Sequence, residues 1–190
     1  MKISVIIPVY NEERTAARVL DNVLAVALPV GMTREVVVVN DGSTDRTAEI
    51  LENYNERISV IVFHQPNQGK TAALVRGIRE SSGDILVIQD ADLEYDPIQY
   101  PTLLAPILSG EADVVYGSRF LGKIEGMRPL NFWANKISNW VFRLLYGVAI
   151  TDINTCFKVF KREAIDGLSI VSKNFAFETE VTAKFIQRGL

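Results

Sequence analysis

Four carboxylates stand on alternate residues directly after the apolar run "DILVI". The stretch "IQDADLEYDP" places them at Asp90, Asp92, Glu94 and Asp96. In an extended chain, side chains two positions apart point to the same side, so Asp90 and Asp92 would repel each other unless a cation lay between them. A Mg²⁺ or Mn²⁺ ion held by one or two carboxylates usually completes its shell with substrate phosphates. We therefore interpret the stretch as a site for a metal-bridged diphosphate, with Glu94 as a third ligand if the chain stays extended.

An exposed acidic turn is the alternative explanation, and the elements around the stretch favour the metal site. Continuous apolar, β-branched runs predict strands over 3–10, 35–40, 58–63, 84–89 and 113–117. Helical spacing predicts helices over 11–27, 43–54 and 70–80, and again after Pro97. This alternation predicts one α/β domain with a mostly parallel central sheet and helices on both faces. Ligands of such sheets bind beyond the carboxyl ends of the strands, where Asp90 and Asp92 would lie.

The segment "PVYNEE" ends the first predicted strand and would line the same crevice. Pro8 suits a strand end because it has no N–H to donate to a neighbouring strand. The ring of Tyr10 can stack on a nucleotide base, and Asn11 and Glu12 can hydrogen-bond one. An ordinary strand-to-helix turn, with acidic residues favoured at a helix N-terminus, explains the segment equally well.

Two further segments follow the second and third predicted strands. In "NDGSTD", Asp41 stands where dinucleotide-binding folds carry an acidic residue for the ribose or base edge, while Gly42 suits the turn and Ser43 a helix cap. "HQPNQGKT" ends like a phosphate-binding P-loop, but His64 occupies the position of its required first glycine. We reject a P-loop and expect Lys70 to meet a phosphate at a helix N-terminus.

Arg119 in "GSRF" and Arg128 in "GMRP" lie in loop-like sequence. A guanidinium group matches the geometry of phosphate, so both could hold an anionic acceptor or leaving group. For each arginine alone, a surface charge is the simpler explanation.

Segment 131–148 predicts a strongly amphipathic helix. Its apolar positions, at helical spacing, are Trp133, Ile137, Trp140, Val141, Leu144, Leu145 and Val148. We favour packing of this face against the sheet. The alternative is a helix at a membrane interface, which the two tryptophans, Lys136 and Arg143 would suit.

Composition narrows the function classes. The 190 residues suffice for one domain with its own core, and a net charge of −3 disfavours a nucleic-acid binder. The lone cysteine, Cys156, permits no internal disulfide and fits a reducing compartment. No apolar stretch reaches the roughly 18 residues that a transmembrane helix needs.

The segments "PVYNE", "NDGSTD", "NQGK", "DADLEYDP", "GSRF" and "TCFKVFKREAI", in this order, resemble a family 2 glycosyltransferase with the GT-A fold. Within that family they are most similar to dolichyl- or polyprenyl-phosphate hexosyltransferases, of the mannosyl or glucosyl branch. The resemblance covers nearly the whole chain. It implies a catalytic domain over 1–190, with a nucleotide-sugar-binding half (1–117) and an acceptor-binding half (118–190). The C-terminal strand and the membrane anchors that are common in the family are missing from this sequence. Truncation of the acceptor-binding half therefore stays open.

The resemblance also implies a reaction, in which a hexose passes from UDP-glucose or GDP-mannose to a polyprenyl phosphate with inversion. It implies Mg²⁺ or Mn²⁺ as cofactor, no nucleic-acid partner, and a cytoplasmic location, peripheral at the inner face of a membrane. The nucleotide-binding positions it implies are Pro8, Tyr10, Glu12, Asp41, Lys70, Asp90 and Ala91. The metal ligands it implies are Asp90, Asp92 and Glu94. The catalytic positions are Asp92, Arg119 and Arg128, and the two arginines, with Ser138, would hold the lipid phosphate. Asn40 departs from the aspartate that many members carry, and "DLEYDP" resembles the glucosyl branch more.

Two alternatives stay open. A phosphate monoester acceptor is largely dianionic at pH 7 and needs positioning rather than deprotonation. A hydroxyl acceptor, on a glycan or glycolipid, needs a general base, for which Glu178 and Glu180 in "FAFETE" are the candidates. The other alternative is a nucleotide-binding module without catalysis.

Overall fold

The computed structural model describes residues 1–55, 57, 59–121, 129–173 and 176–190. Within these ranges, six strands form one sheet in the order β3-β2-β1-β4-β6-β5. Their bounds are β1 (Lys2–Val9), β2 (Thr33–Asp41), β3 (Val60–Gln65), β4 (Ile85–Ile88), β5 (Val114–Tyr116) and β6 (Lys158–Lys161). Strands β3, β2, β1 and β4 are parallel neighbours, whereas β6 runs antiparallel to both β4 and β5.

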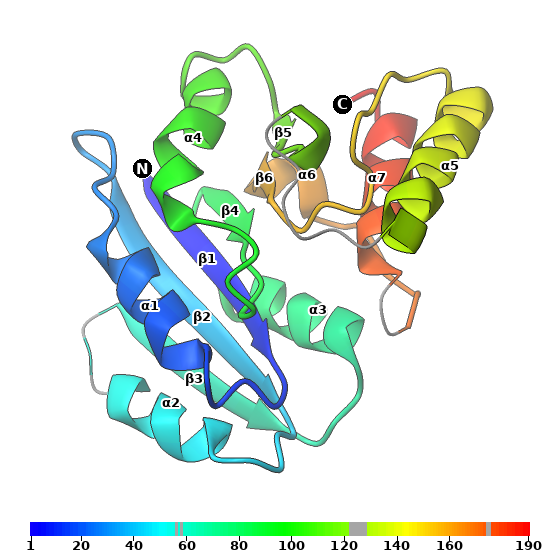
Figure 1. Ribbon diagram of the computed structural model, residues 1–190. Helices are drawn as coiled ribbons and strands as arrows, with labels where there is room; N and C mark the ends of the chain where they lie inside the picture. The colour runs from blue at the N-terminus through cyan, green and yellow to red at the C-terminus, as the bar shows by residue number, and fades with distance from the viewer. Residues whose placement is uncertain (56, 58, 122–128, 174–175) are drawn as a thin grey trace.

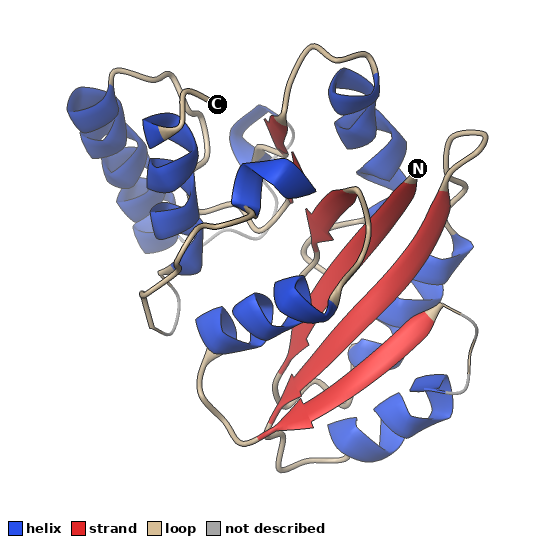
Figure 2. Cartoon of the chain, turned by 180° about the vertical axis from the view of Figure 1, so that it is seen from behind, coloured by secondary structure: helices blue, strands red, loops and turns tan. Residues whose placement is uncertain are grey.

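Helices cover both faces of this sheet. They are α1 (Ala16–Ala25), α2 (Thr47–Asn55), α3 (Lys70–Glu80), α4 (Tyr100–Leu108), α5 (Pro129–Tyr146), α6 (Arg162–Ile165) and α7 (Phe177–Gln187), with the 3₁₀ turns η1 (Pro97–Gln99) and η2 (Arg119–Leu121). Figures 1 and 2 show α1 and α2 on one face of the sheet and α3 on the other. The predicted α/β architecture, a mostly parallel sheet between helices, is confirmed.

The central strands explain why the sheet forms. Seven of the eight residues of β1 and seven of the nine of β2 are buried, as are all four of β4. Runs such as "VVVV" cannot alternate between core and water, so both of their faces must be covered. Helices on both faces provide that cover, and the carboxyl ends of β1, β2 and β4 then meet at one edge.

The sequence analysis missed β6 and placed one helix start wrongly. β6 has four residues, too few to show a period, and pairs with β4 through Leu86 and Phe160, far apart in the chain. The first helix begins at Ala16 rather than Asn11. The backbone of Asn11 has φ 56°, in the left-handed region, so no helix can include it.

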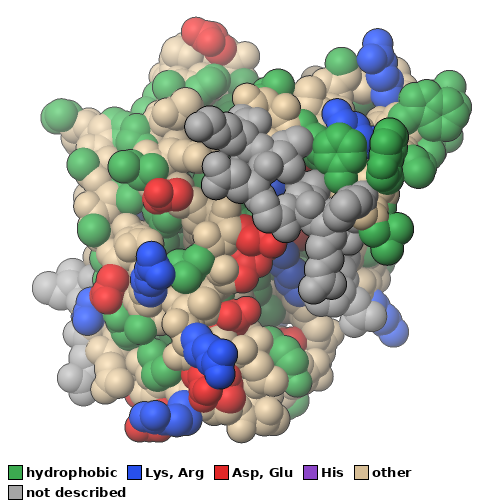
Figure 3. Space-filling view, viewed as in Figure 1, with side chains coloured by type: hydrophobic (Ala, Val, Ile, Leu, Met, Phe, Trp, Pro, Cys, Tyr) green, Lys and Arg blue, Asp and Glu red, His purple; other side chains and the backbone are tan. Residues whose placement is uncertain are grey.

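Helix α5 exposes its apolar face to solvent. Our favoured prediction, that this face packs against the sheet, is therefore wrong. Trp133 and Trp140 are 64% and 65% exposed, whereas Phe142 is buried. The polar face of α5 contacts the protein instead. The Asn139 amide donates to the carbonyl oxygen of Thr151 (2.6 Å) and accepts from the N–H of Ile153 (2.9 Å). Figure 3 shows hydrophobic side chains gathered over α5, at the upper right. Among the described helices, none combines the length and hydropathy needed to cross a bilayer.

Close packing of α3 on β1 depends on Gly77. An added Cβ at Gly77 would lie 2.5 Å from Cγ2 of Ile6, a fully buried side chain. We expect Gly77→Ala to lower the free energy of unfolding by about 1–3 kcal/mol, the usual cost of overpacking, despite alanine's helix propensity advantage of about 1 kcal/mol. Urea unfolding measures the change. Ile6→Ala combined with Gly77→Ala should cost less than the sum of the two single changes, and strict additivity would contradict this explanation.

Candidate active site

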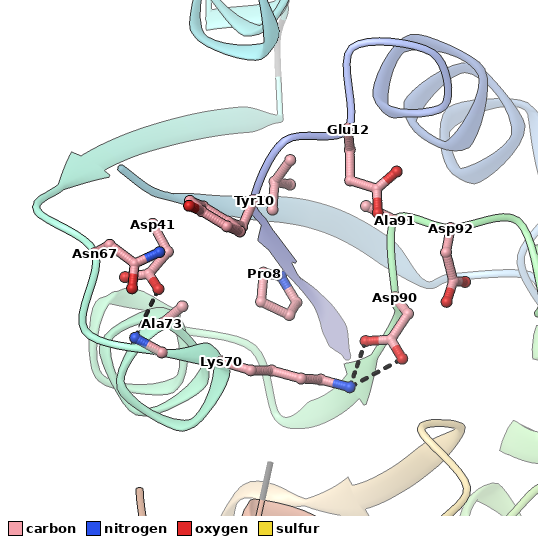
Figure 4. A pocket seen from close by; sticks show the side chains of 12 residues that line it. Pro8, Tyr10, Glu12, Asp41, Asn67, Lys70, Ala73, Asp90, Ala91 and Asp92 are labelled. Carbon is pink, nitrogen blue, oxygen red and sulfur yellow. Dashed lines mark hydrogen bonds and ion pairs between the residues drawn. The ribbon is translucent and has the colours of Figure 1, made fainter. Parts of the chain in front are cut away.

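A pocket of about 420 Å³ opens at the carboxyl ends of β1, β2 and β4. Its lining contains eight of the predicted site residues, namely Pro8, Tyr10, Glu12, Asp41, Lys70, Asp90, Ala91 and Asp92, together with Val9, Asn67, Gly69 and Ala73. Figure 4 shows Asp41 and Asn67 at one end of the pocket and Asp90 and Asp92 at the other. The fold thus brings the predicted nucleotide-binding residues together, as the strand-end rule requires. Their individual roles stay predictions.

Two loops of the pocket wall hold each other through side chains. The N–H of Asn11 donates to Ser43 Oγ (3.0 Å), and the N–H of Thr44 donates to Asn11 Oδ1 (2.8 Å). The N–H of Glu12 donates to Thr47 Oγ1 (2.8 Å). Asn11 thus joins the two loops. The expected cap is corrected, because Ser43 does not cap α2, where Asp45 Oδ1 accepts from the N–H of Thr47 (3.0 Å).

Asp41 is almost fully buried and fixes the loop before α3. Its Oδ1 accepts from Gln65 Nε2 (2.6 Å) and from the N–H of Gln68 (3.0 Å), and its Oδ2 accepts from the N–H of Gly69 (2.8 Å). Gly42, with φ 74°, packs so closely against this loop that an added Cβ would lie 2.6 Å from the Asn67 nitrogen. The Asp41 end of the pocket is therefore rigidly preorganised.

Asn40 turns away from the pocket lining. Its Nδ2 donates to His64 Nδ1 (3.0 Å), which leaves the proton on His64 Nε2 to donate to Glu52 Oε1 (3.0 Å). Asn40 Oδ1 accepts from the N–H of Ser43 (3.1 Å). The departure from the aspartate common in the family thus falls outside the pocket.

Lys70 is the cation at the other end of the pocket. Its Nζ lies 2.8 Å and 2.9 Å from the two carboxylate oxygens of Asp90 and 3.0 Å from Glu178 Oε1. Burial alone would lower the pKa of Lys70, but Cys156, 4.0 Å away, and the two carboxylates raise it above its usual value. Lys70 is therefore held charged, with its ammonium group in the pocket (Figure 4).

The four alternating carboxylates have four different environments. Asp90 binds Lys70, Asp92 Oδ1 accepts from the N–H of Glu94 (3.0 Å), and Asp96 Oδ1 caps η1 through the N–H of Ile98 (3.0 Å). Leu93 has φ 66°, so the chain is not extended there, contrary to the assumption made from the sequence. Burial raises the pKa of Glu94, and the nearby charges of Asp92 and Asp90 raise it further, so Glu94 as a third ligand stays a prediction. Among the described residues, no group of three or more His, Cys, Asp or Glu side chains could hold a metal ion.

Asp90 and Asp92 still suit a cation that a diphosphate would share. Burial removes water from the Asp92 carboxylate and so raises the pKa of Asp92. The negative charge of Asp90 raises this pKa further. A nearby cation would relieve this unfavourable charge. Two carboxylate ligands with phosphates completing the shell is a common Mg²⁺ arrangement, so the two residues fit such an ion without a third protein ligand.

Arg119 lies beside this acidic loop and is oriented by a residue that the sequence analysis missed. Its Nε and NH2 donate to the two carboxylate oxygens of Asp152 (2.9 Å and 3.0 Å). These hydrogen bonds raise the pKa of Arg119. Its NH1 lies 3.9 Å from Glu94 Oε2, which connects Arg119 to the acidic loop. Arg128, the other predicted arginine, lies outside the described residues.

A buried lysine supports the loop that carries Asp152. Lys158 Nζ donates to the carbonyl oxygens of Ile153 (2.9 Å) and Thr155 (2.5 Å), and burial lowers the pKa of Lys158 to about 8. In "TDINTCFKVF", neither Asp152 nor Lys158 shows any spacing that predicts burial. Their roles arise from contacts with residues distant in the chain.

The structure separates the two candidate general bases. Glu180 accepts from the N–H groups of Val171 (3.0 Å) and Ser172 (2.8 Å) and pairs with Lys184 (2.5 Å), so its expected place at a sugar is wrong. Glu178 is buried against Lys70, next to the pocket.

The chain belongs to glycosyl transferase family 2, because the sequence model of that family matches residues 4–168. An undecaprenyl-phosphate 4-deoxy-4-formamido-L-arabinose transferase of Pseudomonas aeruginosa is 33% identical over 169 residues, 87% of this chain and 49% of that protein. A dolichol-phosphate mannosyltransferase of Pyrococcus furiosus is 32% identical over 97% of this chain and 53% of that protein. The chain thus spans about half the length of these curated relatives.

The fold has a solved counterpart. Glucosyl-3-phosphoglycerate synthase from Mycobacterium tuberculosis, in a crystal structure with Mn²⁺, UDP and phosphoglyceric acid, aligns with a TM-score of 0.77 at 25% identity. The alignment covers 98% of this chain and 64% of that chain. The predicted family and its GT-A fold are confirmed.

Removing the Asp152 carboxylate should weaken the structure around Arg119. We expect Asp152→Asn to lower the free energy of unfolding by roughly 2–3 kcal/mol, less than for a fully enclosed ion pair because Arg119 keeps some contact with water. Asp113→Asn is the matched control, because Asp113 pairs with Lys161 (2.6 Å) near the surface and should cost at most about 1 kcal/mol. Equal losses in urea unfolding would contradict the special role of Asp152.

Proposed function

We propose that this protein transfers a hexose, glucose or mannose, from a UDP- or GDP-sugar to a polyprenyl phosphate, assisted by Mg²⁺ or Mn²⁺. The observation that carries the proposal is the arrangement of charges. The ammonium group of Lys70 and the pair of Asp90 and Asp92 lie at the end of the pocket opposite Asp41 (Figure 4), and Arg119 borders the same acidic loop. A diphosphate leaving group and a phosphate acceptor would each find a matching partner there. The two named relatives support the polyprenyl-phosphate acceptor, and the mannosyltransferase also supports a hexose donor, whereas the other is named for a modified arabinose.

The proposed mechanism needs charge neutralisation and positioning. Asp90 and Asp92 would hold the divalent cation. When bound, the cation would neutralise the negative charge that develops on the diphosphate leaving group. The ammonium of Lys70 adds a second positive charge at the same end. Arg119, held by Asp152, would orient the acceptor phosphate toward the anomeric carbon, where the transition state resembles an oxocarbenium ion. Attack opposite the leaving group inverts an α-linked donor to a β-linked product.

A phosphate acceptor fits the described site better than a hydroxyl acceptor. A hydroxyl group needs a general base, and Glu178 is the candidate beside the pocket. Its Oε1 is already held by the ammonium group of Lys70 at 3.0 Å, so this oxygen would have to leave an ion pair to accept a proton from a hydroxyl group. A phosphate monoester needs no such base, because it is largely dianionic at pH 7.

We further propose that α5 docks on a membrane surface. Its exposed apolar side chains are Leu130, Trp133, Ile137, Trp140, Val141, Leu144 and Leu145. Lys136 and Arg143 on the same helix would attract anionic headgroups, and tryptophan favours the interface. This would bring the protein to a lipid-borne acceptor. A free, buried Cys156 fits the reducing side of that membrane, so we propose the cytoplasmic face.

Transfer activity tests the main proposal. We expect radiolabelled sugar to be transferred from UDP-glucose or GDP-mannose to undecaprenyl phosphate in detergent with Mn²⁺. Addition of EDTA should stop this transfer. Asp92→Asn should lower turnover on the order of a hundredfold or more, as loss of a group that stabilises developing charge commonly does.

The matched control is Asp96→Asn in the same acidic stretch. Asp96 caps η1, and asparagine caps a helix as well as aspartate, so turnover should stay at the wild-type level. Activity that survives both EDTA and Asp92→Asn would refute the metal-assisted mechanism. Transfer to a glycan hydroxyl but not to the lipid phosphate would refute the proposed acceptor.

Vesicle sedimentation tests the membrane proposal. Replacing Trp133 and Trp140 together by serine should weaken binding to phosphatidylcholine vesicles containing phosphatidylglycerol about tenfold or more, because two apolar anchors are lost. Val30→Ser is the control, since Val30 is fully exposed in the loop between α1 and β2. Equal binding by all three proteins would contradict docking through α5.

A further inference from the structure

We propose that Asn139 of α5 is a positioning residue for Arg119, and that it joins the helix that docks on the membrane to the arginine that orients the acceptor phosphate. The inference rests on the proposed function, because it concerns the acceptor side of that reaction. It follows from a series of hydrogen bonds that leads from α5 through residues 151–153 to the guanidinium group.

Asp152 fixes both the backbone and the side chain of Arg119. Its Oδ2 accepts from the backbone N–H (3.1 Å) and from Nε (2.9 Å) of Arg119, and its Oδ1 accepts from NH2 (3.0 Å). The Asp152 carboxylate is fully buried, whereas the Arg119 side chain is 25% exposed. The direction in which the exposed edge of the guanidinium group points therefore depends on the position of Asp152.

Asn139 holds the residues on either side of Asp152. Its Nδ2 donates to the carbonyl oxygen of Thr151 (2.6 Å), and its Oδ1 accepts from the N–H of Ile153 (2.9 Å). Two contacts that flank a residue fix its rotation as well as its position, which one contact would not do. Thr151 Oγ1 also donates to Oγ of Ser118, the residue before Arg119 (2.9 Å). Asn139 thus sets the orientation of Asp152 relative to α5.

The loop has a second support that does not involve α5. From the buried side, Lys158 Nζ donates to the carbonyl oxygens of Ile153 (2.9 Å) and Thr155 (2.5 Å). This contact stays when Asn139 is replaced. Loss of Asn139 should therefore shift the segment around Asp152 without unfolding it.

The contact would place Arg119 at a constant depth below the membrane surface. Trp133 and Trp140 are exposed on α5, and we propose that they enter the interface. The phosphate of a polyprenyl lipid also lies at the level of the headgroups. An arginine that is fixed relative to the docked helix would meet this phosphate without a search for the correct depth, which lowers the entropic cost of positioning.

Steady-state kinetics of Asn139→Leu tests this inference. Leucine has a similar volume and a higher helix propensity, but it removes both hydrogen bonds to the loop. We expect kcat/KM for undecaprenyl phosphate to fall about tenfold, as loss of one well-placed hydrogen bond to a charged group would cause. The KM for the sugar nucleotide should stay at the wild-type value. An unchanged kcat/KM for the lipid phosphate, or an equal loss for both substrates, would overturn the positioning role.

Asn53→Leu is the matched control. Asn53 lies on α2, and its amide donates to the carbonyl oxygen of Glu49 within the same helix (3.3 Å). Neither kinetic constant should change in this variant.

A second variant tests whether the effect passes through Arg119. In Arg119→Lys, no planar guanidinium group remains for Asp152 to orient. Adding Asn139→Leu to Arg119→Lys should therefore lower kcat/KM for the lipid phosphate little further. A further fall as large as that in the wild-type background would overturn the role of Asn139 as a positioning residue for Arg119.

A spectroscopic measurement separates this inference from the proposed function. The Nε–H of Arg119 donates to Asp152, so its signal in a nitrogen–proton correlation spectrum, assigned by its loss in Arg119→Lys, should exchange slowly with water. Asn139→Leu should speed this exchange, and Asn53→Leu should not. Unchanged exchange in Asn139→Leu would overturn the inference, whether or not sugar transfer occurs. Faster exchange in a protein that transfers no sugar to a lipid phosphate would retain the link between Asn139 and Arg119 and overturn the proposed function.

Discussion

The ammonium group of Lys70 lies between two carboxylates from distant parts of the chain, and the pocket depends on this contact. Asp90 belongs to the loop after β4, and Glu178 belongs to α7. Without a cation between them, these partly buried carboxylates would destabilise the fold. Lys70 opens α3, where the positive end of the helix dipole disfavours a cation. Such a local conflict, compensated by tertiary contacts, is typical of a functional site.

The same principle recurs around the pocket, where charged and polar side chains are fixed by the protein before any ligand binds. Asp41 is fixed by three donors, Arg119 by Asp152, and the loop of Asp152 by Lys158. Leu93 and Asn11, both with positive φ, show that the loops themselves are held in sparsely populated conformations. Preorganised charges of this kind need little rearrangement when charge develops on a leaving group.

Helix α5 follows a different physical rule from the rest of the chain. Asn135 and Asn139 fix its polar face to residues 151–154, while its apolar face is exposed. A large exposed apolar surface in a folded protein generally marks an interaction site. In this chain the same residues 151–154 also carry Asp152, so the helix and the partner of Arg119 are fixed to one segment.

The sequence by itself determined the α/β class, the existence of the strands β1 to β5 along the chain and the segments that meet in the pocket. These follow from runs such as "VVVV" and from polar residues at strand ends, which are local patterns with a direct structural meaning. Only the tertiary structure decided the antiparallel β6, the outward face of α5, the pairing of Lys70 with Glu178 and that of Arg119 with Asp152. Amphipathic spacing reports that a helix has two faces but not which of them meets the protein. A carboxylate's partner depends likewise on contacts between distant segments, and no local pattern records those contacts.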